Sequence, residues 1–257
     1  MTLTDRTIAA IRHTHDHLAE VASRLTDEEL GRIGGASEWT VATTLSHLGS
    51  GQEINRYVLQ RAVGDDSETP GNQEVWDRWN ALPPTDQASA FVEASTAMVE
   101  FLEGLTPEQR MGTMVDLGFL PQPVPLATSL GMRVNELALH GWDVDVAFDP
   151  AAQVSEESAE VITEHFASTM SFLLGFTGKP SGLPPTRMSF GAWTLVSTDE
   201  GIRIAEGVTD PSARFEGPVE AAVRLMAGRL APEHTPAGTT VTGNVTLDEL
   251  RAAFPGY

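Results

Sequence analysis

Two residues able to bind a metal ion, Glu136 and His140, lie four positions apart in the segment RVNELALHGWDVDVAF. On a helix this spacing stacks the carboxylate and the imidazole on one face, where both can reach one cation. Most pairs of this kind are ordinary solvated pairs. This pair, however, borders an apolar arc of the same helix, formed by Val134, Leu137, Gly141 and Val144. Polar groups at the edge of a buried face need partners, which favours a shared cation.

A third candidate ligand is His47, which lies beside Leu48 on another predicted helix. The same arc holds Gly51, Ile54 and Val58, so we expect His47 to point inward. Two ligands on one helix and one on another are a recurrent way for a helical bundle to bind metal. Two nitrogens and one oxygen with open coordination positions suit a catalytic Zn²⁺ site, although Ni²⁺, Mn²⁺ and Fe²⁺ accept the same ligands.

Arg133 and Asp143 lie one helical turn before and one turn after the Glu136/His140 pair. There they are positioned to orient ligands or to meet an anionic substrate. For Arg133 a surface ion pair with Glu136 is an equal alternative. For Asp143 we expect a carboxylate that fixes the orientation of a metal-binding imidazole.

The other five histidines have less informative surroundings. His13 and His17 project away from the apolar face of the first predicted helix, and we interpret both as solvated. His15 lies on that apolar face, either as a core histidine with a hydrogen-bond partner or as part of an internal pocket. His165 and His234 have no partner motif, so no chemical role is assigned to them.

Helical periodicity dominates the first two thirds of the chain and predicts the elements that position these residues. The apolar face of the first helix consists of Ile8, Ile11, His15, Leu18, Ala22 and Leu25. A second helix is predicted to begin after Thr40, a suitable N-cap, and to continue to Leu59. Residues 64–85 are predicted to form a polar loop with one short helix, and further helices are expected at 86–104, 126–148 and 155–175.

The Gly- and Pro-rich stretch FTGKPSGLPP (176–185) ends the helical pattern and predicts a domain boundary. Downstream, MSFGAWTLVSTDEGIRIAEG predicts a hairpin of two strands with a turn at 199–201, and ARFEG predicts a third strand. A helix at 218–230, a strand at 239–245 and a final helix in TLDELRAAF follow. We therefore expect an α+β protein with a helical bundle over 1–178 and a small α/β domain over 185–257.

Composition excludes several classes of function. The 257 residues include 36 acidic and 16 basic side chains, a net charge of -20, which disfavours nucleic-acid and membrane partners. The chain has no cysteine, so any thiol chemistry needs a bound thiol. No signal-peptide core and no run of about 18 apolar residues is present, so we expect a cytoplasmic protein. Lys179 is the one lysine, and this arginine bias is typical of a GC-rich genome.

The segments SEWTVATTLSHL and RVNELALHGWDVDVAF together resemble the mycothiol-dependent maleylpyruvate isomerase family, a branch of the DinB-like metal-binding four-helix bundles. The residues that fit the family pattern are Trp39, Thr40, Val41, His47, Leu48, Arg133, Glu136, His140 and Asp143. The resemblance implies that the matching His, Glu and His bind a divalent metal, usually zinc. It also implies mycothiol, a thiol of actinobacteria, as cosubstrate, and a C-terminal domain similar to sterol carrier proteins whose helix ends in Gly228-Arg229.

The chain departs from the family pattern at Ala42 and Thr43, where an Arg and an Asp are common. An acid at this place caps the helix, so the difference concerns stability more than chemistry. The resemblance also implies that a basic residue of the small domain assists catalysis. Arg214 and Arg229 are the candidates for that residue.

These observations predict a metalloenzyme that activates mycothiol for addition to an electrophilic small molecule. If the thiolate adds to a conjugated alkene and then leaves, the product is a cis/trans isomer. If it stays, the product is an S-conjugate, so the metal site alone does not separate an isomerase from a thiol transferase. The alternatives are a metal-dependent hydrolase and a non-catalytic metal- or ligand-binding protein. The sequence leaves the substrate and the oligomeric state open.

Overall fold

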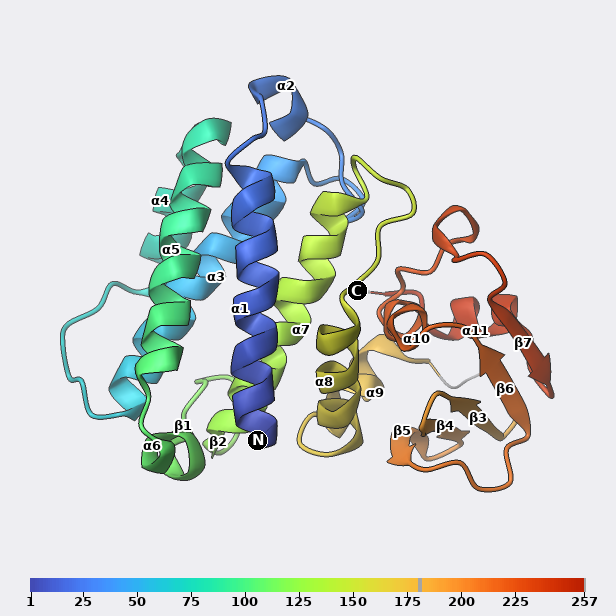
Figure 1. Cartoon of the computed structure of the whole chain (residues 1–257). Helices are drawn as coiled ribbons and strands as arrows, with labels where there is room; N and C mark the ends of the chain where they lie inside the picture. The colour runs from blue at the N-terminus through green and yellow to red at the C-terminus, as the bar shows by residue number, and fades with distance from the viewer. Residues whose placement is uncertain (180–181, 257) are drawn as a thin grey trace. The chain divides into compact units, whose positions relative to one another are not determined.

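The computed structural model describes residues 1–179 and 182–256 (Figure 1). The chain divides into two compact units, Met1–Phe148 and Asp149–Tyr257. The first unit is mainly helical, and the second combines helices with a five-stranded sheet. The predicted α+β class is therefore confirmed. Within the described residues, no helix is both long and apolar enough to cross a membrane.

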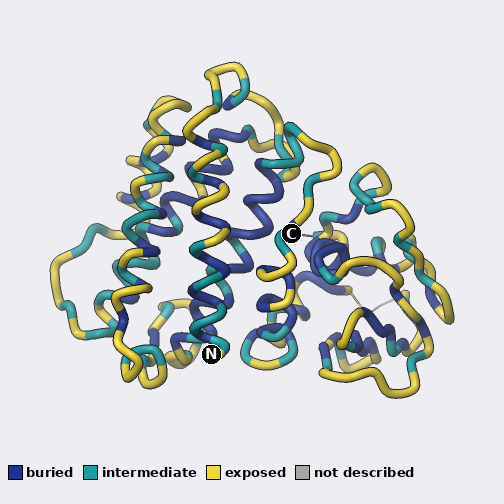
Figure 2. The backbone as a smooth tube through the Cα atoms, viewed as in Figure 1, coloured by how far each residue is buried: buried dark blue, intermediate teal, exposed yellow. Residues whose placement is uncertain are grey.

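Four long helices build the described first unit. They are α1 (Leu3–Ala22), α3 (Val41–Ala62), α5 (Pro84–Gly104) and α7 (Leu126–Asp145). Both α1 and α3 pack against α5 and α7, and the buried residues gather where these helices meet (Figure 2). Shorter elements connect them, namely α2 (Asp27–Leu30), α4 (Asn72–Asn80), α6 (Pro107–Gly112) and the paired strands β1 (Met114–Val115) and β2 (Val124–Pro125).

The starts of the first two long helices follow from their capping residues. Thr2 begins α1 in a capping box with Asp5, which satisfies backbone N–H groups that have no partner within the helix. Thr40 caps α3 as predicted, and its hydroxyl accepts a hydrogen bond from the Thr43 N–H at 3.1 Å. The predicted apolar face of α1 is buried, but the helix ends at Ala22, before Leu25.

The second unit is built on a mixed sheet in the order β5-β4-β3-β6-β7. Its strands are β3 (Thr186–Phe190), β4 (Trp193–Thr198), β5 (Gly201–Glu206), β6 (Ala213–Glu216) and β7 (Thr240–Gly243). The β3/β6 pair is parallel and the other pairs are antiparallel. The helical elements are α8 (Glu156–Ala167), η1 (Ser171–Leu173), α9 (Leu174–Thr177), α10 (Val219–Met226), η2 (Pro232–His234) and α11 (Leu247–Ala253).

Two predicted elements of this unit were wrong in part. The helix expected over 155–175 ends at Ala167, because Ser168 leaves the helical conformation with φ -132° and ψ -95°. The segment expected as one hairpin contains three strands, since Gly191 adopts a φ of +52° and reverses the chain between β3 and β4. The predicted turn at 199–201 does join β4 to β5.

The boundary between the compact units lies before α8, earlier than the boundary predicted from the sequence. The physical reason is that α8 packs on α10 and β5 of the second unit. The predicted domain limits, 1–178 and 185–257, stay a prediction. Pro180 and Ser181, in the predicted linker, lie outside the described residues.

Candidate metal centre

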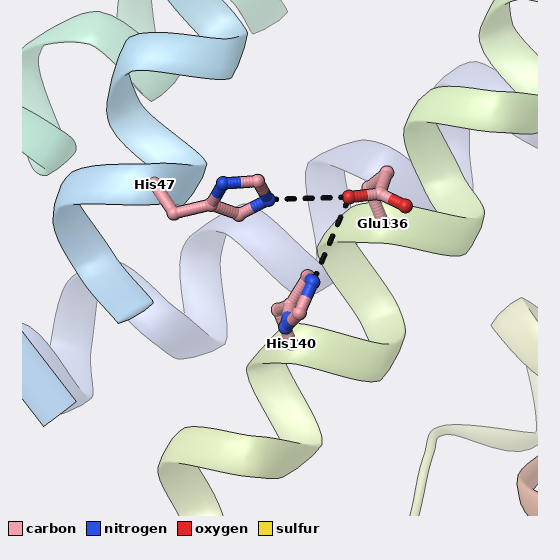
Figure 3. Close-up of side chains that lie close together, drawn as sticks. All are labelled: His47, Glu136 and His140. Carbon is pink, nitrogen blue, oxygen red and sulfur yellow. Dashed lines mark hydrogen bonds and ion pairs between the residues drawn. The ribbon is translucent and has the colours of Figure 1, made fainter. Parts of the chain in front are cut away.

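Three side chains from two neighbouring helices converge in the first unit (Figure 3). His47 comes from α3, and Glu136 and His140 come from α7. The Oε2 atom of Glu136 lies 3.3 Å from Nε2 of His47 and 3.7 Å from Nε2 of His140. One ligand atom from each residue lies within 4.8 Å of the other two. The structure thus brings together the three residues predicted as metal ligands.

This spacing fits a single small cation. Ligand atoms about 2.1 Å from a tetrahedral zinc ion are about 3.4 Å apart, so the two distances to Glu136 are close to those in a bound site. Two imidazole nitrogens and one carboxylate oxygen also form a donor set typical of catalytic zinc, with a position left for a further ligand. The donor chemistry and the spacing therefore both suit a divalent metal.

Close packing between α3 and α7 makes this convergence possible. A Cβ atom at Gly51 would lie 2.8 Å from Nη1 of Arg133, so the end of the Arg133 side chain lies against α3 at this glycine. Arg133 is one turn before Glu136 on α7, and Gly51 is one turn after His47 on α3. The contact therefore lies between the ligand-bearing segments of the two helices.

The expectation that His47 points inward was wrong in degree. Its side chain is 41% exposed, compared with 26% for Glu136 and 9% for His140. His47 lies at the edge of α3 and turns sideways toward Glu136, because the neighbouring Leu48 and Leu45 take the buried positions. Small molecules can therefore reach the site from the His47 side.

Asp143 is hydrogen-bonded to one of the candidate ligands. Its Oδ2 atom lies 2.8 Å from Nδ1 of His140, and the Asp143 side chain is fully buried. A carboxylate at Nδ1 favours the tautomer with a proton on this nitrogen, which leaves the Nε2 lone pair directed toward Glu136. The geometry thus agrees with the predicted orienting role of Asp143.

The electrostatics of the site keep Glu136 ionised. Burial by itself would raise the pKa of Glu136, but the hydrogen bond with His47 and the charge of Arg133 outweigh it and lower the pKa to about 2. Burial in turn lowers the pKa of Arg133, against the influence of Glu136. A carboxylate that stays charged at neutral pH is ready to bind a cation.

Arg133 contributes a cationic group next to the candidate ligands. Its side chain is half-buried and makes no hydrogen bond and no ion pair shorter than 4.0 Å with the described residues. The surface ion pair with Glu136, the alternative considered from the sequence, is therefore not formed at contact distance. The guanidinium keeps its donors available for an anionic ligand.

The remaining histidines lie outside the three-residue cluster. His15 is buried and its Nδ1 lies 2.9 Å from Oγ of Ser95, so it is a core histidine with a partner. His13 is exposed as predicted. His17 is half exposed but bonded to Oδ2 of Asp145 at 2.8 Å, which corrects its interpretation as purely solvated. Packing of α1 on α7 brings the side chains of His17 and Asp145 together.

His165 and His234, which were given no chemical role, both belong to the second unit. His165 is buried and its Nδ1 lies 3.1 Å from the hydroxyl of Thr169. His234 Nδ1 lies 3.2 Å from the carbonyl oxygen of Pro150.

The two predicted basic residues of the small domain also belong to the second unit. Arg214 lies on β6 with an exposed side chain. Arg229 follows α10, is half-buried and donates a hydrogen bond from Nη1 to the carbonyl oxygen of Ala227 at 3.1 Å. A part for either residue in catalysis stays a prediction.

Sequence reasoning assigned no role to Trp39, which the structure places against the cluster. Its ring centroid lies 5.0 Å from that of His47 and 5.8 Å from that of His140. The available signal was its position directly before Thr40, the residue that starts the helix carrying His47.

Comparisons with known proteins show the family and the fold of the chain. Residues 11–145 match the family described as the mycothiol maleylpyruvate isomerase N-terminal domain. No curated protein sequence matches the chain. The chain is similar to the crystal structure of the mycothiol-dependent maleylpyruvate isomerase, with 18% identity, 95% of each chain covered and a TM-score of 0.62. A histidine-to-alanine mutant of that isomerase gives a TM-score of 0.64 with the same identity and coverage. This likeness shows a shared fold over nearly the whole chain.

Proposed function

Since the chain belongs to the mycothiol maleylpyruvate isomerase family, we propose that it is an enzyme that uses mycothiol and a divalent metal to attack an electrophilic small molecule. His47, Glu136 and His140 hold the metal, and zinc is the proposed ion. The observation that carries the proposal is the convergence of these three ligands at metal-binding spacing in a chain that has no cysteine. Because a reduced thiol is needed, a cytoplasmic location belongs to the proposal.

The residues around the cluster have separate tasks in this proposal. A divalent metal bound here supplies the positive charge that lowers the pKa of a thiol toward neutrality. Asp143 keeps the His140 ring in place through the 2.8 Å hydrogen bond to Nδ1. The exposed side of His47 leaves an approach for the thiol and the electrophile.

Arg133 is proposed to bind an anionic group of the substrate. Its guanidinium is half-buried, and no described residue supplies a hydrogen-bond acceptor for it. A polar group that loses water without gaining a partner costs free energy, and an anionic substrate next to Glu136 would provide that partner. In a thiol-transfer assay, Arg133→Gln should therefore raise KM for an anionic electrophile more than KM for a neutral one.

Two reaction outcomes are consistent with the proposed chemistry. The thiolate sulfur forms a C–S bond to one alkene carbon, and the electron pair of the double bond moves into the conjugated acceptor group. After rotation about the resulting single bond, the pair returns and the C–S bond breaks, which gives the isomer and frees the thiolate. If a proton reaches the carbanion first, the S-conjugate is the product.

The test compares purified wild type with His47→Ala. Elemental analysis should find one metal ion per wild-type chain and a large loss in the variant. Mycothiol should support either isomerisation of maleylpyruvate or conjugation of a fluorogenic electrophile by the wild type alone. Full metal content in His47→Ala would contradict the proposed site. Turnover of ester or amide substrates without any thiol, and no reaction with mycothiol, would contradict the proposed chemistry and favour a hydrolase.

A further inference from the structure

Trp39 contacts both candidate histidine ligands at once. Its ring is tilted by 55° against His47 at a centroid distance of 5.0 Å and stacked within 18° on His140 at 5.8 Å. The two imidazoles come from different helices, and their own centroids are 4.9 Å apart. Trp39 is 37% exposed, so it covers the site from outside and does not belong to the core.

The two histidines differ in how their second nitrogen is held. Nδ1 of His140 is hydrogen-bonded to the buried carboxylate of Asp143. The His47 ring is hydrogen-bonded to Glu136 through Nε2, and no described residue is hydrogen-bonded to its Nδ1. A metal-binding histidine almost always has a partner at its second nitrogen, which fixes the plane of the ring. No described residue of the protein supplies that restraint to His47, and the two rings that contact its ring are those of Trp39 and His140.

The backbone around Trp39 is tied to α7 next to the site. The N–H of Gly35 donates a hydrogen bond to the carbonyl oxygen of Asp143 at 2.8 Å. A Cβ atom at Gly35 would lie 2.7 Å from Oδ1 of Asp143, and one at Gly34 would meet the Asp143 carbonyl oxygen. Neither glycine has a positive φ, so the backbone conformation does not require glycine at these positions. The close approach of both residues to Asp143 does require it.

Further hydrogen bonds fix Trp39 itself within this segment. Its N–H donates to the carbonyl oxygen of Ala36 at 3.0 Å, and its own carbonyl oxygen accepts from the N–H of Gly34 at 3.1 Å. The next residue, Thr40, forms an antiparallel bridge with Ile33 and caps α3. The indole is therefore held by a short segment that is anchored on both helices carrying the ligands.

We propose that Trp39 is a positioning residue of the metal centre. Its indole restricts the ring plane of His47 in place of a hydrogen-bond partner from the protein at Nδ1, and it stacks on the ring of the second candidate ligand, His140. The segment Gly34–Thr40 holds Trp39 in this position. Loss of the indole is expected to weaken metal binding and to speed metal release. This inference rests on the proposed metal site and not on the proposed thiol chemistry.

The experiment uses the full-length protein loaded with Zn²⁺ or Co²⁺. Zinc affinity and the rate of zinc release to a chromophoric chelator are measured for wild type, Trp39→Ala and Trp39→Phe. Trp39→Ala should bind zinc about 10- to 100-fold more weakly, the usual cost of losing a group that orients a ligand. Trp39→Phe should recover most of the affinity because it keeps a planar ring. Trp76→Ala is the matched control, since Trp76 is 44% exposed on α4 and, within the described part of the chain, its ring makes no ring contact with His47 or His140.

The visible absorption of the Co²⁺ protein adds a readout that a purely structural role would not change. A shift of this spectrum in Trp39→Ala, without a shift in Trp76→Ala, is the expected result. If Trp39→Ala does not fold, Trp39→Leu takes its place with the same expectation, since leucine keeps the apolar bulk but has no planar face. Wild-type affinity, release rate and cobalt spectrum in the folded variant would overturn the inference. A wild type that binds no metal would overturn the metal centre and this inference together. None of these measurements needs a thiol or turnover, so failure of the proposed chemistry is seen separately.

Discussion

Replacing Asp143 with asparagine removes one negative charge next to the candidate metal centre and keeps the shape of the side chain. Asp143 is fully buried, and its Oδ2 atom lies 2.8 Å from Nδ1 of His140. The carboxylate makes the His140 ring a better donor to a cation and holds the Nε2 atom toward Glu136. An amide at this position can still form a hydrogen bond but supplies no charge.

The expected effect follows from the strength of this contact. Hydrogen bonds to charged groups contribute about 1.5–3 kcal/mol, and loss of a group that orients a metal ligand costs about 10- to 100-fold in metal affinity. The two ranges agree, because that loss corresponds to about 1.4–2.7 kcal/mol. The metal-free variant should stay folded, because asparagine fills the same volume and can still form a hydrogen bond, but it should unfold at a lower temperature than the wild type.

The assay is competition for zinc with a chelator of known affinity at neutral pH, together with thermal unfolding of both metal-free proteins. Asp145→Asn is the matched control on the same helix. Asp145 bonds to His17 at 2.8 Å and to none of the three ligands, so its replacement should leave zinc affinity unchanged. Equal zinc affinity in Asp143→Asn, Asp145→Asn and wild type would refute the idea that Asp143 orients a ligand.

Three further outcomes are expected. Glu136→Gln should reduce bound zinc to below about a tenth of the wild-type content, because the anionic member of the three candidate ligands is lost; elemental analysis checks this, and full occupancy would count against the site. Gly49→Ala should cost about 1–3 kcal/mol in urea unfolding, because a Cβ atom there would overlap the buried ring of Trp79; an unchanged midpoint would show that the core can adapt. The hydrogen bond to Asp145 raises the pKa of His17, so its stabilising contribution is complete below pH about 6.5 and is lost as pH rises through the raised pKa. His17→Ala should therefore lower the free energy of unfolding more at pH 5.5 than at pH 8.5, and an equal effect at both would contradict this.

Much of the local structure of the first unit could be predicted from the sequence because short-range rules determine it. Thr40 begins α3 as an N-cap residue, and the spacing of Glu136 and His140 places them on one face of α7. The compact turn at Gly191 escaped prediction, because an isolated glycine within an apolar stretch does not reveal its backbone conformation in advance. The early end of α8 at Ala167 had no strong sequence signal either.

One part of the candidate site could be predicted from the sequence, and another part depends on the tertiary structure. The types and spacing of Glu136 and His140 are properties of one helix, and the sequence alone was sufficient to pair them. The approach of His47 depends on how closely α3 packs on α7, and the cover provided by Trp39 depends on a loop that is hydrogen-bonded to Asp143. These contacts join residues that are far apart in the chain. Only the packing of the helices decides these contacts, because the periodicity of the sequence does not determine which helix faces meet or how closely they approach.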